Sequence, residues 1–201
     1  MIPIVILAAG ASTRMGTPKQ LLSYQGRSFL RQITEVAIAS VCEPVIVVLG
    51  SNADKMRSEI SSLPVVVVEN LLWTVGMSAS IKTGMELLYT LPHLEAVVLT
   101  LCDQPFISPQ IINQLVETYH FTNKPIIACQ YADTLGVPAI FDHSLFAELT
   151  ALQGTQGAKQ IIYSHIHQVI PISFPQGAVD IDTPEDYQQL SKHEDYTFVT
   201  S

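Results

Sequence analysis

The residues whose types and spacing most clearly suggest a chemical function form a loop near the N-terminus that could enclose a polyphosphate. Residues 8–13 are all small, which leaves their backbone N–H groups uncovered, and Gly10 and Gly16 can adopt backbone angles closed to other residues. A loop of this kind can surround a triphosphate with its amides. Arg14 and Lys19 add positive charge at the place where the phosphate oxygens would lie.

The charge distribution favours a small anionic ligand at this loop. Residues 1–34 contain four basic residues and no Asp or Glu, whereas the whole chain of 201 residues has a net charge of −8. A negative overall field disfavours nucleic acid and anionic membrane surfaces as partners. No apolar run reaches the length of about 20 residues that a membrane span needs. Basic residues scattered on a solvated face are the alternative interpretation.

Two familiar phosphate-binding motifs do not fit the loop. The interval from Gly10 to Gly16 is too wide for the G-x-G-x-x-G dinucleotide fingerprint. A Walker A loop has Lys and then Ser or Thr directly after its second glycine, and here Thr17 and Pro18 follow. On spacing alone, the segment is either a phosphate-binding loop of another kind or an ordinary turn between a strand and a helix.

An acidic residue that could bind a metal ion, Asp103, follows a later apolar run, and an acidic cluster precedes the last predicted helix. Asp103 stands at the carboxyl end of the run 96–101, and Asp180 and Asp182 belong to an acidic cluster at 180–186. Mg²⁺ prefers a few carboxylates together with water and substrate phosphates. A helix cap or a turn is the alternative for Asp103, and it is the ordinary interpretation of Asp182 from its position alone.

The elements that must position these residues alternate between strands and helices. Apolar runs rich in β-branched residues predict strands at 2–8, 45–49, 65–68, 96–101, 125–129 and 168–173. The runs are continuous, which is typical of parallel strands covered on both faces. Helical patterns between them predict helices at 28–41, 53–62, 78–90, 109–120, 143–152, 157–165 and 184–192.

This order of elements predicts an α/β fold, a three-layer α/β/α sandwich around a mostly parallel, twisted sheet. Ligands of such sheets bind beyond the carboxyl ends of the strands, so the N-terminal loop and Asp103 should share one edge. We expect residues 1–192 to form a single domain and residues 193–201 to form a polar C-terminal tail.

Local signals mark two of the helix starts and the state of the cysteines. Ser108-Pro109 and Thr183-Pro184 each place a capping residue before a proline. Glu185 and Asp186 then suit the first turn of the last helix, whose dipole favours negative charge. The three cysteines fit no disulfide framework or zinc motif, which is typical of buried, reduced thiols in a cytosolic protein.

The N-terminal loop resembles the signature L-A-A/G-G-x-S-x-R-M-G-x-x-K of the molybdopterin nucleotidyltransferases. This resemblance implies a Rossmann-like fold of the nucleotide-diphospho-sugar transferase type and a loop that holds the NTP triphosphate. It also implies that Arg14 and Lys19 are catalytic, because they neutralise phosphate charge during transfer. The matching positions are Leu7, Ala8, Ala9, Gly10, Ser12, Arg14, Met15, Gly16 and Lys19.

Two acidic motifs extend the resemblance, which runs from residue 4 to about residue 190. Residues 102–105 are similar to the C-D-Q-P motif of the cytidylyltransferase branch, whose aspartate binds the metal. Residues 182–186 are similar to D-T-P-E-D, whose first aspartate supplies a second ligand. The resemblance therefore implies a catalytic Mg²⁺ site on Asp103 and Asp182, with Asp180 as the second choice for the latter.

Two further features concern the nucleotide. Residues 76–84 resemble G-x-S-x-S-[LI]-[RK]-x-G, a loop that enters a helix near the base and ribose, which implies that Ser78 and Ser80 bind the nucleotide. Ser78 as a simple helix cap is the alternative. Ala9 favours CTP by resemblance, because guanylyl members of the family tend to have glycine there and a methyl group leaves less room near the base.

The acceptor segments match the family less closely. Residues 136–141 resemble G-x-P-x-x-F near the acceptor, which implies that Gly136 and Pro138 bind it. Residues 154–159 resemble G-D-x-G-A-R, with threonine in place of the aspartate and Lys159 in place of the arginine. Lysine keeps the charge but loses the planar fork. Lys159 is expected to bind the acceptor, and the identity of that acceptor stays open.

The resemblance implies a cytoplasmic, Mg²⁺-dependent cytidylyltransferase. It would transfer CMP from CTP to the phosphate of molybdopterin, release pyrophosphate, and deliver the product transiently to a molybdenum enzyme or its chaperone. One alternative keeps the chemistry and changes the acceptor to a sugar phosphate or polyol phosphate. The other is a non-catalytic protein that binds nucleotide or molybdenum cofactor and delivers it to a partner.

Overall fold

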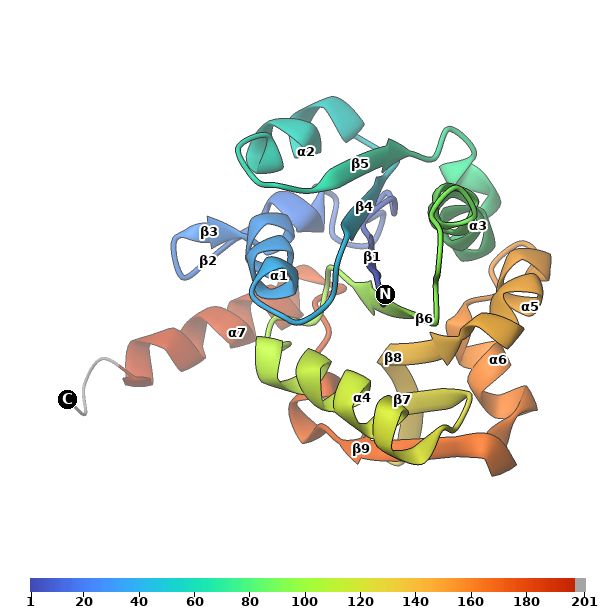
Figure 1. The fold of residues 1–201 in the computed structure, drawn as a ribbon. Coiled ribbons are helices and arrows are strands. Elements are labelled where there is room, and N and C mark those ends of the chain that lie inside the picture. The colour runs from blue at the N-terminus through green and yellow to red at the C-terminus, as the bar shows by residue number, and fades with distance from the viewer. Residues whose placement is uncertain (198–201) are drawn as a thin grey trace.

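One sheet of seven strands, in the order β5-β4-β1-β6-β8-β7-β9, forms the centre of the molecule (Figure 1). The structure, a computed structural model, describes residues 1–197, with side chains described for residues 1–190. A small hairpin of β2 (Ser23–Tyr24) and β3 (Arg27–Ser28) stands apart from this sheet. The strands of the central sheet are β1 (Ile4–Leu7), β4 (Val45–Leu49), β5 (Val66–Glu69), β6 (Ala96–Leu101), β7 (Ile126–Tyr131), β8 (Thr134–Asp142) and β9 (Val169–Ser173).

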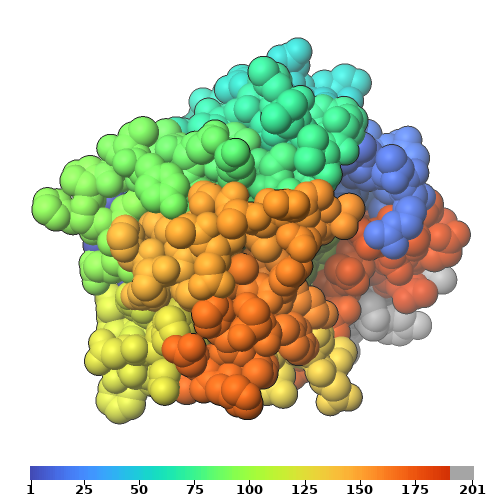
Figure 2. All heavy atoms as spheres, turned by 90° about the vertical axis from the view of Figure 1, so that its right-hand side faces the viewer, coloured from blue at the N-terminus to red at the C-terminus, as the bar shows by residue number. Residues whose placement is uncertain are grey.

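Helices cover both faces of this sheet, so the predicted α/β/α sandwich is confirmed (Figure 1). One face carries α1 (Phe29–Ile38), α2 (Ala53–Ile60) and α4 (Pro109–Thr122). The other carries α3 (Met77–Leu88), α5 (Phe146–Ala151) and α6 (Ala158–Ser164), and in Figure 2 the orange α5 and α6 lie against the green α3 segment. The last helix is α7 (Pro184–Thr197).

The central strands explain why the apolar runs are continuous. Every residue of β1 and of β4 is buried. Along β1, Ile4 and Ile6 belong to the core beneath α1, whereas Val5 and Leu7 belong to the core beneath α3. Because successive side chains of a strand point to opposite faces, a strand covered on both sides needs apolar residues at every position.

The predicted helix starts are confirmed by their caps. Ser108 accepts a hydrogen bond from the backbone N–H of Ile111 at 3.4 Å, and Pro109 is the first residue of α4. Thr183 and Asp186 form a reciprocal capping box at the start of α7, with 2.8 Å from Thr183 N to Asp186 Oδ2 and 3.3 Å from Asp186 N to Thr183 Oγ1. Asp186 therefore stabilises the end of a helix, as predicted.

Strand β8 was not predicted from the sequence, because Pro138 lies in the middle of it. The strand runs antiparallel between β6 and β7. Its pairing with β7 shifts between Ala128, opposite Ala139, and Cys129, opposite Gly136. Pro138 therefore lies in a bulge, where its missing N–H group breaks no ladder hydrogen bond. Because β8 is antiparallel to both neighbours, β7 runs in the same direction as β6, and the turn after β7 reaches the edge where β1 and β6 end.

Other differences from the predicted elements lie at their ends. The first strand is shorter than predicted, and the first residues of the helix predicted at 143–152 form a 3₁₀ turn, 143–145. Helix α7 continues to Thr197, so residues 193–197 of the predicted tail are helical, while residues 198–201 lie outside the described part of the chain. The division into one domain and a tail remains a prediction. Within the described residues, no helix is both long and apolar enough to span a bilayer.

Candidate active site

A charged cluster of Arg14, Lys19, Asp103 and Asp182 lies at the edge of the sheet where β1 and β6 end, with Lys19 at its centre. Its ammonium nitrogen Nζ is 2.8 Å from Asp103 Oδ2 and 2.6 Å from Asp182 Oδ1. The lysine side chain is only 16% exposed, and the two aspartates are 17% and 26% exposed. Three predicted site residues from distant parts of the sequence therefore converge in a partly buried ion-pair network.

Arg14 extends this network toward solvent. Its guanidinium nitrogen Nη2 lies 2.5 Å from Asp182 Oδ2, and its side chain is 70% exposed. Burial acts to raise the pKa of Asp182, but the hydrogen bond and charge of Lys19 and the charge of Arg14 outweigh it and hold that pKa below its usual range. Asp182 is thus an ionised carboxylate at neutral pH.

The N-terminal loop has the free amides that a phosphate-binding loop needs. Within the described residues, the backbone N–H groups of residues 9–14 donate no hydrogen bond. The loop turns back at Ser12, which has φ of +54°, and at Gly16, with φ of +73°. Ser12 Oγ accepts a hydrogen bond from the backbone N–H of Lys19 at 3.1 Å. This contact fixes Lys19 next to the open amides.

Gln20 holds the loop in place and was not predicted from the sequence to belong to the site. Its side chain is 2% exposed, and its amide nitrogen donates to the carbonyl oxygens of Ala8 at 3.1 Å and Gly10 at 2.8 Å. Its amide oxygen lies 3.1 Å from the hydroxyl of Ser12. A buried polar side chain that satisfies carbonyls two residues apart fixes the loop backbone. Leu7, Ala8 and Ala9 are themselves buried.

The Asp103 carboxylate fits a divalent metal ion. Its Oδ1 atom is buried and has no hydrogen-bond partner among the described residues. No group of three His, Cys, Asp or Glu side chains in that part of the chain could hold a metal. Asp103 and Asp182, which both contact Lys19, are the two carboxylates here that could hold an ion such as Mg²⁺ or Mn²⁺, with water and substrate phosphates as further ligands.

Asp180 lies near the cluster without joining its ion pairs. Burial, followed by the charges of Asp103 and Asp182, raises the pKa of Asp180 above its usual value. The backbone N–H of Ile181 donates to the carbonyl oxygen of Asp103 at 3.0 Å, which ties the 180–182 segment to the end of β6. This tie brings the side chain of Asp182, rather than that of Asp180, to Lys19.

The two serines predicted to bind nucleotide are buried and engaged with the protein. Ser78 donates its hydroxyl to the carbonyl oxygen of Gly154 at 2.8 Å. The hydroxyl of Ser80 accepts from the side-chain amide of Asn70 at 3.0 Å. Asn70 is 2% exposed and also accepts from the backbone N–H of Leu72 at 2.9 Å. These contacts shape the loop before α3, and a direct role of the serines stays a prediction.

Two predicted motifs meet at the start of α3. Gly76 has φ of +125° and ψ of −167°, a backbone conformation that is essentially restricted to glycine. A Cβ atom on Gly76 would lie 2.5 Å from the carbonyl oxygen of Gly154. The backbone of the 76–78 segment therefore packs directly against the 154–157 segment.

We expect Gly76→Ala to lower the free energy of unfolding by about 3 kcal/mol, because the new methyl group adds backbone strain and a steric clash. Urea denaturation measures this. Gly10→Ala is the matched control, since a Cβ atom there meets no atom within 4 Å. Equal stabilities of the two variants would contradict the close packing of the two segments.

The residues predicted to bind the acceptor lie behind or beside the surface near Asp103. Gly136 and Pro138 are buried in β8. Lys159 is exposed, and its Nζ atom lies 5.8 Å from the ring centroid of Tyr163. The hydroxyl of Tyr163 in turn lies 3.0 Å from Thr134 Oγ1, at the start of β8. A direct contact of Gly136, Pro138 or Lys159 with an acceptor stays a prediction.

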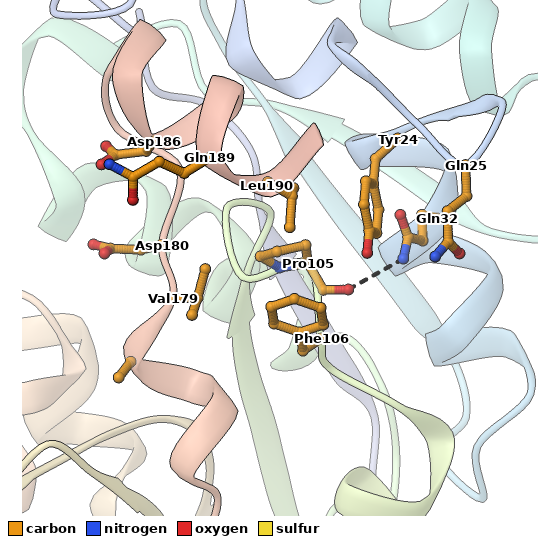
Figure 3. Close-up of a pocket in the computed structure, with 11 residues that line it drawn as sticks. Tyr24, Gln25, Gln32, Pro105, Phe106, Val179, Asp180, Asp186, Gln189 and Leu190 are labelled. Atoms are coloured by element: carbon orange, nitrogen blue, oxygen red, sulfur yellow. Dashed lines mark hydrogen bonds between the residues drawn. The ribbon is translucent and has the colours of Figure 1, made fainter. Parts of the chain in front are cut away.

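Two cavities border the 178–180 segment. The larger has a volume of about 730 Å³ and lies between the β2–β3 hairpin, Pro105-Phe106 and α7 (Figure 3). In Figure 3 the side-chain amide of Gln32 donates to the carbonyl oxygen of Pro105, at 3.1 Å. The smaller, of about 200 Å³, is lined by Asp103 itself. Asp180 lines both cavities.

The three cysteines are buried free thiols, as predicted. Burial raises the pKa of the Cys42 thiol to about 11, and it also raises the pKa of Cys102, next to Asp103. Neutral thiols of this kind are poor nucleophiles and poor metal ligands. The charged cluster therefore acts through its lysine, arginine and carboxylates.

Comparisons with known proteins match nearly the whole chain. The family model described as a MobA-like NTP transferase domain matches residues 4–169. Nicotine blue oxidoreductase of Paenarthrobacter nicotinovorans is 29% identical over 195 residues, which cover 92% of this chain and 94% of that protein. A probable molybdenum cofactor guanylyltransferase of Bacillus cytotoxicus is 32% identical over 113 residues, which cover 55% of this chain and 53% of that protein.

A solved structure is similar over almost its full length. Rv0371c of Mycobacterium tuberculosis has 31% sequence identity and a TM-score of 0.81, with 95% of this chain and 97% of that chain covered. Its complex with manganese has a TM-score of 0.75, with 94% and 97% covered.

Proposed function

Because the chain belongs to the MobA-like NTP transferase domain family, we propose that it transfers CMP from CTP to the phosphate of molybdopterin. An oxygen of the acceptor phosphate attacks the α-phosphorus of CTP. The new P–O bond forms as the bond to the bridging oxygen breaks, and pyrophosphate leaves with the electron pair. An acceptor phosphate is already ionised at neutral pH, so the transfer needs no general base. Catalysis is then positioning and charge neutralisation.

The residues of the charged cluster have distinct roles in this reaction. The open amides of residues 9–14 bind the triphosphate, and Lys19 and Arg14 stabilise the negative charge that moves onto pyrophosphate. Asp103 and Asp182 would hold Mg²⁺ or Mn²⁺. When bound, this ion supplies Lewis-acid stabilisation of the phosphate oxygens. Gln20 keeps the loop carbonyls away from the phosphates by binding two of them.

One observation carries the proposal: Asp103 and Asp182 converge on Lys19 beside a loop with unused amides. A two-carboxylate site needs further ligands, and nucleotide phosphates supply them. A protein that only binds and delivers a nucleotide has no need of this arrangement at the α-phosphate. The convergence therefore supports a transferase over a carrier.

The direct test is pyrophosphate release by the purified protein with each of the four NTPs, molybdopterin, and Mg²⁺ or Mn²⁺. We expect release to depend on the metal and on molybdopterin and to be fastest with CTP. Release with glycerol 3-phosphate or ribose 5-phosphate instead would replace the acceptor by a polyol or sugar phosphate. Tight CTP binding without pyrophosphate from any acceptor would favour the non-catalytic delivery protein.

The name of one relative, nicotine blue oxidoreductase, suggests a different chemistry, an oxidation or reduction. The N-terminal loop argues against a dinucleotide-dependent form of it, because Gly10 and Gly16 lack the dinucleotide-binding spacing. The same preparation can be assayed for NADH or NADPH oxidation with nicotine blue. Turnover there together with no pyrophosphate release would overturn the transferase proposal.

The proposed preference for CTP depends on Ala9. Its side chain is 3% exposed and lies against Gly50, where an added Cβ atom would come within 2.8 Å of the Ala9 methyl group. We expect Ala9→Gly to shift the ratio of kcat/KM for CTP over GTP toward GTP by about tenfold, since one methyl group contributes about 1–3 kcal/mol of discrimination. Competition between the two nucleotides in one reaction measures this ratio. An unchanged ratio would remove Ala9 from base selection.

A further inference from the structure

The smaller cavity beside Asp103 is formed by parts of the chain that no predicted nucleotide contact uses. Besides Asp103, its lining includes Gln104, the β7–β8 turn at Tyr131 and Thr134, and Asp180. None of the residues that line it belongs to the N-terminal loop. A molecule in this cavity would contact Asp103 and would leave the N-terminal loop free for the nucleotide.

Tyr131 forms one wall of this cavity and is held in a slot made by two glycines. A Cβ atom on Gly136 would lie 2.3 Å from the Tyr131 hydroxyl, and one on Gly177 would lie 2.7 Å from its ring atom Cδ1. The hydroxyl donates to the carbonyl oxygen of Val137 at 3.1 Å. The ring can occupy this position only because neither neighbour has a side chain. Gly136, predicted from sequence to bind the acceptor, thus makes room for Tyr131.

Gln104, the residue after Asp103, connects this wall of the cavity to the end of β6. The side-chain amide of Gln104 donates to the carbonyl oxygen of Gly177 at 2.9 Å. Gln104 follows Asp103 directly and is 6% exposed, and its oxygen Oε1 has no hydrogen-bond partner among the described residues. A buried acceptor without a partner is rare in folded proteins and indicates a place for a hydrogen-bond donor.

The turn at the end of this wall is strained. Ala132 has φ of +44° and Asp133 has φ of +59°, and of these two residue types only aspartate commonly adopts such angles in turns. Two-residue hairpin turns with positive φ at both positions strongly prefer glycine, asparagine and aspartate, so the strain lies at Ala132. Strained backbone of this kind gathers at binding and catalytic sites. Here it fixes the positions of Tyr131 and Thr134 at the edge of the cavity.

We propose that this cavity receives the acceptor next to its phosphate and that Tyr131 determines which acceptors fit. The inference rests on the proposed nucleotidyl transfer. The lining side chains offer carboxylate, amide and hydroxyl groups and no cation. The seated part of the acceptor therefore carries no negative charge and presents hydroxyl, amino or ring N–H donors, while its phosphate turns toward Lys19.

Lys159 is connected to this cavity through Tyr163. The hydroxyl of Tyr163 accepts from the backbone N–H of Leu135 at 3.2 Å as well as contacting Thr134. Lys159 lies over the Tyr163 ring. Thr134, a lining residue, is thus linked through Tyr163 to Lys159, a positive charge on the same side of the cavity.

The test compares Tyr131→Ala and Tyr131→Phe with the wild type in pyrophosphate release. Using molybdopterin, glycerol 3-phosphate and ribose 5-phosphate as acceptors, we expect Tyr131→Ala to raise the KM of the preferred acceptor at least about tenfold. The KM for CTP should change less than about twofold. Tyr131→Phe should keep the wild-type acceptor KM, because the ring forms the wall. Tyr89→Ala, at the exposed end of α3, is the matched control.

An unchanged acceptor KM in a folded Tyr131→Ala variant would overturn the inference, and so would an equal rise in the KM for CTP. Equilibrium binding of molybdopterin without any NTP separates this inference from the proposed function. In one outcome, Tyr131→Ala weakens molybdopterin binding while the wild type releases no pyrophosphate. This result supports the cavity as a binding site and overturns the proposed transferase. In the opposite outcome, the wild type releases pyrophosphate but Tyr131→Ala binds molybdopterin as tightly as the wild type does. This result supports the transferase and overturns the cavity as the acceptor site.

Discussion

The Asp103→Asn variant is expected to lose at least about 100-fold in the rate of pyrophosphate release, because asparagine cannot supply the charge that binds a divalent metal. Asparagine keeps the size and one oxygen of the aspartate, so the loss reports the charge and not the packing. Lys19 would keep only one of its two carboxylate partners, Asp182. Steady-state pyrophosphate release with saturating metal and CTP measures the effect.

A matched control is available at the opposite edge of the sheet. Asp142 ends β8, opposite the first residue of β6, and its contacts are with Tyr119 and Ser144. Asp142→Asn should leave the rate unchanged. Retention of activity in Asp103→Asn would remove the carboxylate from the mechanism. Mn²⁺ binding to both variants gives a second readout, in which only the Asp103 variant should weaken.

The sequence predicted the layers of the fold because burial leaves a direct trace in residue type. Strands such as β1 and β4 are apolar at every position, since both faces are covered. Strand β8 left no such trace. Pro138 argues against a strand in any reading based on local pattern, and only the pairing with β7 reveals the bulge that accommodates it.

The candidate site was predictable where chemistry and position coincide. Arg14, Lys19 and Asp103 were predicted from their charge and from their places after strands, Asp182 was predicted from the resemblance of residues 182–186 to a family motif, and the structure brings all four together. The positioning residues were not predictable in this way. Gln20, Asn70 and Tyr131 act through contacts between segments that are distant or folded back, and nothing in their immediate sequence indicates those contacts.

The roles of the serines and glycines in the motifs were harder to assign for a related reason. A motif shows that residue types recur together, but not whether a hydroxyl faces a ligand or a neighbouring strand. Ser78 binds the carbonyl of Gly154, and Gly136 accommodates Tyr131. Both motifs therefore help to build the site, and the groups that face the cavity lie on other residues.

Lys19 raises a question about the order in which ligands enter. Its ammonium group already neutralises Asp103 and Asp182, the two carboxylates that fit a metal ion. Partial burial acts to lower the pKa of Lys19, but the charge and hydrogen bond of Asp103 and those of Asp182 outweigh it and raise that pKa. The lysine is thus charged, and a divalent cation that uses both carboxylates competes with it.

This competition gives the second large effect, in which two measurements move in opposite directions. Lys19→Met should lower the rate of pyrophosphate release about 100-fold, because a charge that stabilises the leaving pyrophosphate is lost. The same variant should bind Mn²⁺ at least about tenfold more tightly without nucleotide, because two carboxylates about 3 Å from the former ammonium are no longer neutralised. Electron paramagnetic resonance of free Mn²⁺ measures the second quantity.

The opposite signs distinguish competition from simple damage to the site. If the substitution distorts the site, both the activity and the affinity for metal fall. If it only removes the competing ammonium group, the activity falls and the affinity for metal rises. Lys124→Met, an exposed lysine before β7, should change neither quantity. If Lys19→Met binds Mn²⁺ no more tightly than the wild type, the ammonium does not compete with the metal. If it does bind more tightly, CTP has a second role: its triphosphate draws Lys19 away from the aspartates and so allows the metal to enter with the nucleotide.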